Sequence, residues 1–376
     1  MYASRMQFGL RAADPPRAIE VRPRLERAGP VALIGLAALA PLAFGTGSDV
    51  LHDMVLTAAY VVMALGLNLV VGFAGLLDLG YVAFFAIGAY TAAYFASGFW
   101  AHAGDGHGVA IFAGDAAAQL PGIHLNLLLV FALAAAATAL AGAVIGVPTL
   151  RLRGDYIAIV TLAFGEIIGR VAANGRDIGL LGGTLTSGPI GIGPIDRIDL
   201  PFLERFGALD LRPWYWFALA LVVAVLVVNV RLRRSRVGRA WIAVREDEGA
   251  AAASGIPVAR TKLLAYASGA ALGGVAGAFL ASYLSVVNAD QFAFSFSIFV
   301  FTMVVVGGLG SIPGVVAGAI VLSAINNYLL PDVLSTLPSR LGVDFDPSVV
   351  TSGVYGVIIV LVMLLRPEGV LAGVRS

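Results

Sequence analysis

The sequence predicts an all-α membrane protein: a polytopic bundle of about ten transmembrane helices with both termini in the cytoplasm. Three observations support this fold class. Of the 376 residues, 59% are hydrophobic and only 12% are charged, far from the composition of a soluble domain, in which about a quarter of residues are charged. The mean hydropathy is accordingly +0.91. Apolar runs of transmembrane length recur along the chain, and basic residues gather in a few of the segments between them.

Each apolar run is predicted to cross the bilayer as a helix, because lipid leaves no other partner for an open backbone. The segments near 74–80 and 306–314 could instead be re-entrant turns, because the joins there are very short. The predicted spans are 31–47, 54–73, 79–98, 125–148, 156–173, 214–230, 263–285, 292–310, 312–330 and 348–365.

Orientation follows from the distribution of Lys and Arg, which are enriched in cytoplasmic segments. If the N-terminus is cytoplasmic, 18 of the 24 basic residues lie on the cytoplasmic side, in 1–29, 151–154, 231–262 and 366–376. Trp100 and the cluster at 214–216 then lie at the outer interface, where aromatic rings are favoured. We therefore predict a multi-pass membrane protein.

Composition also suggests the domain organisation. A basic arm at 1–30 precedes a membrane domain at 31–366, and a short cytoplasmic tail follows at 367–376. Two outer loops, at 99–124 and 174–213, and the cytoplasmic segment at 231–262 are too small for a catalytic domain. The chain has no cysteine and only four scattered histidines, so no thiolate or histidine metal site is expected. We predict no enzymatic activity, no metal and no cofactor.

The densest block of charge begins at Gly238 with GRAWIAVREDEGAAAASGIP. Ala and Glu favour helix, and Gly255 followed by Pro257 is typical of a helix end. The pattern predicts one helix of about four turns over 238–254 at the cytoplasmic surface. Trp241, Ile242 and Val244 give it a face suited to burial, so the helix could be a solvated connector or a docking surface for a partner.

If ATP drives this protein, another chain must bind it. The sequence contains one lysine, Lys262, and it follows Thr261. A phosphate-binding loop needs the pattern GxxxxGK[ST], which this lysine does not fit.

Several motifs within the spans have two interpretations. Glu166 and Arg170 lie four residues apart, hence on one helix face; they could line a pathway or proton relay, and an ion pair is favoured. Asp78 interrupts the apolar pattern and marks either a broken helix at a substrate site or, as we favour, a capped turn near the membrane surface. GxxxG patterns at 269–277 and 310–318 predict close helix packing, within this chain or against a second membrane subunit.

Four blocks, in the same order, resemble the permease subunits of branched-chain amino-acid ABC importers, in particular the M-type member of the permease pair. They are 67–93, 150–170, 185–192 and 238–281. The resemblance covers roughly 58–330 and implies that the charged helix docks on an ATPase subunit. In such importers this loop carries E-A-A-x-x-x-G. Here Gly255 matches the final glycine, and Gly249 stands where the glutamate is expected.

The resemblance implies an ATP-driven importer of leucine, isoleucine, valine or related amino acids in the bacterial plasma (inner) membrane. Its implied partners are a sister permease, two cytoplasmic ABC ATPase subunits and an extracytoplasmic solute-binding protein. The residues expected to couple to the ATPase are Arg239, Trp241, Arg245, Glu246, Asp247, Glu248, Ala250, Ala251 and Gly255. The candidate translocation pathway comprises Asn68, Gly72, Gly75, Phe84, Thr161 and Glu166.

Two alternatives remain open. A permease of the same superfamily could carry another small solute, such as urea, an amide, a sugar or a nucleoside. An ion-coupled secondary transporter using Glu166 would need no ATPase.

Overall fold

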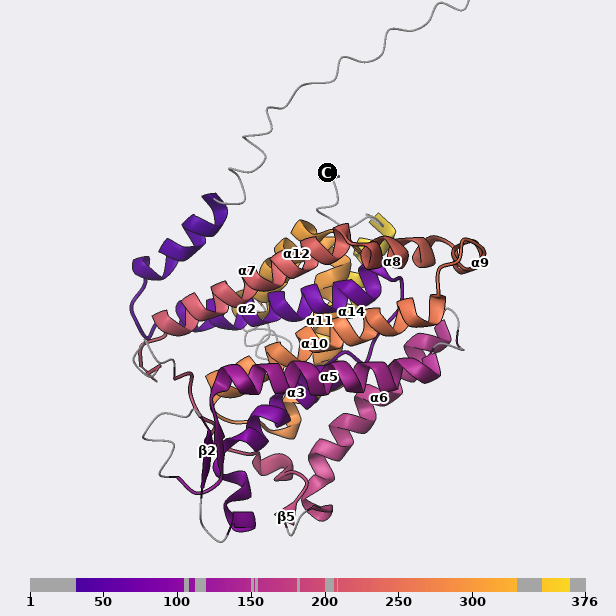
Figure 1. Cartoon of the computed structure of the whole chain (residues 1–376). Coiled ribbons are helices and arrows are strands. Elements are labelled where there is room, and N and C mark those ends of the chain that lie inside the picture. Colours follow the sequence, from indigo (N-terminus) through magenta and orange to yellow (C-terminus); the bar gives the residue numbers. More distant parts are fainter. Residues whose placement is uncertain are drawn as a thin grey trace, which may run out of the picture. The chain divides into compact units, whose positions relative to one another are not determined.

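The computed structural model describes most of the chain between residues 32 and 365, and the predicted arm at 1–30 and tail at 367–376 lie outside the described residues. The first compact unit, Met1–Ala43, contributes the apolar helix Ala32–Ala43. All other elements belong to the second unit, Phe44–Ser376, shown with the first in Figure 1. The described ranges are 32–104, 108–111, 120–149, 152, 155–180, 183–199, 206–207, 209–329 and 347–365.

Five helices of the second unit are long and apolar enough to cross a membrane. They are α2 (Asp49–Leu67) with its π-helical extension η2 (Asn68–Phe73), α5 (Leu127–Thr149), α6 (Asp155–Asn174), α7 (Arg212–Arg234) and α10 (Val258–Leu284). The shorter apolar elements are α3 (Val82–Phe95), α11 (Phe294–Gly307), α12 (Ile312–Ala324) with η7 (Ile325–Leu329), and α14 (Pro347–Leu365). This confirms a mostly helical protein of membrane composition.

Each predicted span overlaps one of these helices or the helix Ala32–Ala43, but the number that cross the bilayer stays a prediction. Helices α3 and α11 have 14 residues each, or about 21 Å at 1.5 Å per residue, against a hydrocarbon core of about 30 Å. Neither can cross alone. If α3 crosses the bilayer, a flanking segment such as the irregular 74–81, which joins it to η2, has to supply the missing length.

Short strands lie among the loops that the sequence places on the outer side. The sheet has the order β1 (Ala96–Ser97), β3 (Ile123–Leu125), β2 (Val109–Ile111), with β1 antiparallel and β2 parallel to β3. Gly179–Leu180 (β4) pairs with Gly183–Thr184 (β5) as a hairpin. Short 3-10 turns complete these loops: η3 (Gly98–Gly104), η4 (Gly175–Asp177), η5 (Gly188–Ile190) and η6 (Ala289–Phe292).

Helix α10 packs against α2, α3 and α5 and forms the centre of the unit. Its glycines allow this packing: a Cβ atom on Gly269 would lie 2.9 Å from the carbonyl oxygen of Gly66, and one on Gly277 would lie 2.1 Å from that of Phe85. The first glycine pattern therefore packs within this chain, as small residues in membrane helices commonly do. In the second pattern, a Cβ on Gly314 would lie 2.0 Å from the Gly307 oxygen, which brings α12 onto α11.

The charged segment differs from the single helix predicted over 238–254. Helix α7 continues to Arg234, and two helices follow, α8 (Arg236–Glu246) and α9 (Glu248–Ala253). The break is at Asp247, whose extended backbone (φ −157°, ψ 111°) lets its side chain accept a hydrogen bond from the Ala250 N–H. Aspartate is among the preferred residues for starting a helix in this way. In Figure 1 this pair of helices lies at one end of the unit and β2 at the other.

Candidate functional site

The ends of α8 and α9 are fixed by local hydrogen bonds. The Ser235 hydroxyl accepts a hydrogen bond from the Gly238 N–H at 3.2 Å and so caps the start of α8. At the end of α9, the Gly255 N–H donates to the Ala252 carbonyl and the Ile256 N–H to the Ala251 carbonyl, both at 3.0 Å. This pair of bonds is a Schellman motif, which needs a left-handed residue, and Gly255 has φ +82°. The predicted helix stop at Gly255 is confirmed.

Two contacts anchor the pair α8–α9, which we call the coupling segment, to the start of α10. The buried Trp241 indole N–H donates to the Thr261 carbonyl at 2.8 Å. The Lys262 Nζ lies 2.5 Å from the Glu248 Oε1, with the lysine side chain 3% exposed and the glutamate 40% exposed. Trp241 and Ala251 are buried, so both pack within this chain and position the segment.

A third contact joins the coupling segment to the membrane helices. The Arg245 guanidinium donates a hydrogen bond to the carbonyl of Gly72 in η2. There is no room at this junction for a side chain on Gly75, whose Cβ would lie 2.7 Å from the Arg245 Cγ. Gly75 also has φ +69°, a conformation that glycine adopts readily. The structure thus brings a predicted coupling residue against two predicted pathway residues.

The same junction reaches the turn between α11 and α12. The Asn68 Oδ1 accepts a hydrogen bond from the Gly310 N–H at 2.9 Å, although the two residues are 242 positions apart. Asn68 begins η2, and Gly72 lies in the same π-helical turn. The coupling segment, the end of α2 and the α11–α12 turn are therefore held together by one short run of backbone.

Asp78 is not in a surface turn as expected. It is 1% exposed, and one carboxylate oxygen, Oδ1, accepts a hydrogen bond from the Gly80 N–H at 2.9 Å. Its segment folds back into the bundle: the Leu79 N–H donates to the Thr161 hydroxyl on α6, and the Ser297 hydroxyl on α11 donates to the Leu79 carbonyl. The local turn exists, but tertiary packing buries it.

The remaining pathway candidates lie in two separate places. Thr161 lies beside the Asp78 carboxyl, and the Phe84 ring packs edge-on against the ring of Tyr81, three residues earlier. Glu166 instead lies on an open face of α6, where its side chain is 47% exposed and pairs with Arg170 at 3.9 Å. The favoured ion pair is present, but both partners are too exposed to fix helix packing within this chain.

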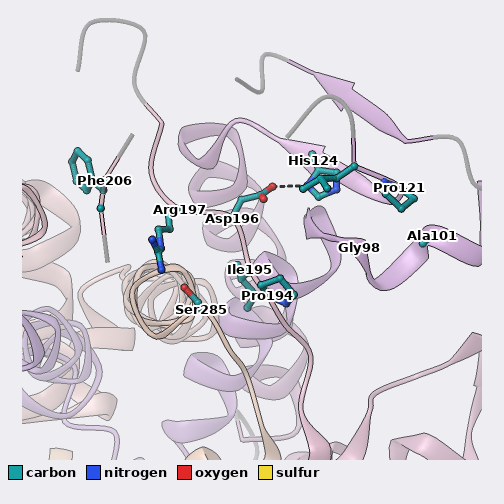
Figure 2. A pocket seen from close by; sticks show the side chains of 12 residues that line it. Gly98, Ala101, Pro121, His124, Pro194, Ile195, Asp196, Arg197, Phe206 and Ser285 are labelled. Atoms are coloured by element: carbon teal, nitrogen blue, oxygen red, sulfur yellow. Dashed lines mark hydrogen bonds and ion pairs between the residues drawn. The ribbon is translucent and has the colours of Figure 1, made fainter. Parts of the chain in front are cut away.

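Figure 2 shows a pocket among the loops near β1 and β3. Its volume is about 560 Å³, and it is lined in part by His124, Asp196 and Arg197. The His124 Nδ1 lies 2.6 Å from the Asp196 Oδ2, and the histidine side chain is 2% exposed. The pocket lining therefore carries polar and charged groups. Among the described residues, no three His, Asp or Glu side chains are grouped to hold a metal.

Sequence reasoning missed the polar partners that only the fold brings together. His124 and Asp196 are 72 positions apart, and the sequence gives no signal that joins them. The Glu248–Lys262 pair was accessible in principle, because a lone lysine close to an acidic run suggests an ion pair.

Comparison with known proteins identifies the family. The family model described as branched-chain amino acid transport system / permease component matches residues 50–363. The chain belongs to this family of permeases. It is 35% identical to the high-affinity branched-chain amino acid transport system permease protein LivM of Escherichia coli over 98% of this chain and 81% of the relative.

Two further relatives support the M-type assignment within the family. A probable LivM of Methanocaldococcus jannaschii is 26% identical over 61% of this chain and 64% of its own. The LivH permease of E. coli is 32% identical, but over only 38% of this chain and 42% of its own. The similarity to LivM thus extends over far more of the permease than the similarity to LivH. No solved structure matches the chain.

Proposed function

We propose that this permease is the membrane-spanning subunit of an ATP-driven importer of branched-chain amino acids. It would pair with a sister permease, bind two cytoplasmic ATPase subunits through the coupling segment, and receive substrate from an extracytoplasmic binding protein. ATPase closure would move the coupling segment, and the bundle would alternate access to a site between its helices. ATP itself would be bound by the partner subunits.

The observation that carries the proposal is the contact of Arg245 with Gly72. A merely solvated connector needs no hydrogen bond to a membrane helix, whereas a force-transmitting segment does. The two anchors at Trp241 and Glu248 hold the segment against α10, so displacement of the segment would also reach the centre of the bundle. The exposed side of α8, which includes Ile242 and Glu246, is left for the ATPase.

The proposed substrates are leucine, isoleucine and valine, because the relatives described above are named for branched-chain amino acid transport. Apolar pockets separate solutes that differ by one methylene by only about 1 to 3 kcal/mol, so these amino acids would share one path. A same-superfamily permease for urea, an amide, a sugar or a nucleoside would instead give uptake that leucine does not compete for.

The docking role is tested by co-purification of the ATPase subunits with the permease complex. Glu246→Arg changes an exposed side chain of α8, so we expect the protein to fold and ATPase recovery to fall roughly tenfold, the effect of about 1.4 kcal/mol. Asp177→Arg is the matched control, because Asp177 is an exposed acid in the turn that follows α6.

Normal ATPase recovery with both Ile242→Asp and Glu246→Arg would contradict docking through this face. For transport, the wild-type complex with its binding protein should take up radiolabelled leucine into proteoliposomes only with internal ATP. Leucine uptake that persists without ATP and depends on an ion gradient would instead support the secondary transporter.

A further inference from the structure

We propose that the buried carboxylate of Asp78 binds the α-ammonium group of the substrate amino acid during passage through the permease. This inference rests on the proposed function and adds a substrate site to it. The site is the Asp78 cluster, which we define as Asp78, Tyr81, Thr161 and Tyr266.

One oxygen of the Asp78 carboxylate lacks a charged partner among the described residues. The Asp78 Oδ1 is satisfied by the Gly80 N–H, but within the described part of the chain Oδ2 has no hydrogen-bond partner. The Thr161 hydroxyl beside the carboxyl has only one hydrogen to donate, and it also lies 3.1 Å from the Ala158 carbonyl oxygen, to which it donates, so it supplies Asp78 at most a shared, neutral hydrogen bond. A buried acid that lacks a partner is costly, and in membrane helices such groups commonly mark substrate or ion pathways.

Two cations in and beside the coupling segment are engaged by other groups. The Lys262 ammonium is engaged by Glu248, and the Arg245 guanidinium donates to Gly72. A second oxygen lies near: the Tyr266 hydroxyl is buried beside Thr149 and within electrostatic range of Asp78, and it can accept a hydrogen bond as well as donate one. A carboxylate oxygen and a hydroxyl oxygen that can both accept hydrogen bonds match an ammonium group, which only donates.

The position of the cluster suits a translocation site. Asp78 lies in the irregular segment 74–81, between η2 and the short helix α3. Three residues on, the Tyr81 hydroxyl donates to the Gly269 carbonyl at 2.8 Å, and Gly269 is near the middle of the 27-residue helix α10. Transporters commonly bind substrate where membrane helices are interrupted near the midplane. Buried Phe84 beside Tyr81 offers apolar surface for an aliphatic side chain.

Helix α6 covers the cluster, and its contact with the segment is one that can open. A Cβ on Gly80 would lie 1.8 Å from the Thr161 carbonyl oxygen, and a Cβ on Gly165 would lie 3.1 Å from the Gly80 Cα. The two backbones therefore touch without interlocking side chains at this point. Separation of α6 would break the hydrogen bond between Leu79 and Thr161 and expose the Asp78 carboxylate.

The test measures leucine transported per ATP hydrolysed by the complete complex in proteoliposomes with its binding protein. For Asp78→Asn we expect this ratio to fall about tenfold or more, the effect of losing a charge-assisted hydrogen bond, while binding-protein-stimulated hydrolysis continues. Tyr266→Phe should lower the ratio by roughly twofold to fivefold, because a neutral acceptor contributes less. Asp78→Glu, which keeps the carboxylate, should fall between wild type and Asp78→Asn.

Ser297→Ala is the matched control, because it removes a hydrogen bond to the same segment at Leu79 without changing a charge; its ratio should stay at the wild-type value. A wild-type ratio in Asp78→Asn overturns the inference. So does a parallel loss of uptake and hydrolysis that leaves the ratio unchanged, which indicates a structural role. If Asp78→Asn does not assemble, Tyr266→Phe decides by the same ratio. A wild-type complex that hydrolyses ATP but moves no branched-chain amino acid refutes the proposed function itself.

Discussion

The Glu248–Lys262 ion pair should decide whether the coupling segment stays docked on α10. Glu248→Gln leaves the Lys262 ammonium, 3% exposed, without its counter-charge. Removing one partner of a buried pair costs about 3 to 5 kcal/mol. Because Glu248 is itself 40% exposed, water can reach the site, and we expect a smaller loss, about 2 kcal/mol.

A loss of about 2 kcal/mol raises the population of the undocked segment roughly thirtyfold. Hydrogen-exchange mass spectrometry measures this directly on the peptide 247–256, whose amides include the Ala251 N–H bonded to the Asp247 carbonyl at 3.0 Å. We expect exchange of that peptide to accelerate by about this factor, whereas exchange in α5 should not change.

The double variant Glu248→Gln/Lys262→Met provides the internal control. Methionine has nearly the length of lysine but carries no charge, and replacing both members of a buried pair by uncharged groups is often close to neutral. Exchange should therefore return most of the way to the wild-type rate. Unchanged exchange in Glu248→Gln, or no recovery in the double variant, would refute the reasoning that the ion pair holds the segment.

Three further predictions follow from contacts in the same unit. Arg245→Ala removes the hydrogen bond to Gly72; ATPase co-purification should persist, while uptake per ATP falls at least twofold, as loss of about 0.5 kcal/mol or more of coupling requires. Gly255→Val should destabilise the end of α9 by about 1 to 2 kcal/mol, because Gly255 has φ +82°. Gly255→Asn should cost less, because asparagine tolerates this conformation; the hydrogen-exchange rate of the Ile256 amide measures the loss in each variant. Gly88→Ala would place a Cβ 2.1 Å from a carbonyl oxygen of α10 and should cost about 1 to 3 kcal/mol in thermal unfolding, unlike Gly353→Ala, which meets no described atom within 4 Å.

The order and approximate position of the helices were predictable because apolar runs of membrane length leave few alternatives. The end of the charged helix at Gly255 was also predictable, since the requirement for a left-handed residue is local. The break at Asp247 was missed because Asp247 was counted only as one charge in a helical run. Its role as the N-cap of α9 depends on an extended backbone that composition does not reveal.

The candidate site was predicted less completely because its contacts are non-local. Asn68 and Gly72 were singled out, but the partner of Asn68 is Gly310, 242 residues later. Asp78 was expected near the surface because sequence distance from the predicted span ends was the available guide. The segment 74–81 folds back against Ser297 and Thr161. This position depends on packing among helices, which single-sequence patterns do not encode.

The chain carries its only lysine at position 262, under the coupling segment. An amine-reactive reagent such as an N-hydroxysuccinimide ester needs access to a free amino group, and this one is enclosed and held by Glu248. Modification of Lys262 should therefore be slow while the segment is docked and should accelerate whenever it lifts. The wild-type protein thus contains a chemical reporter of its own. The rate of Lys262 modification, followed by peptide mass spectrometry in the presence and absence of ATPase subunits, would record the movement of the coupling segment without any engineered residue.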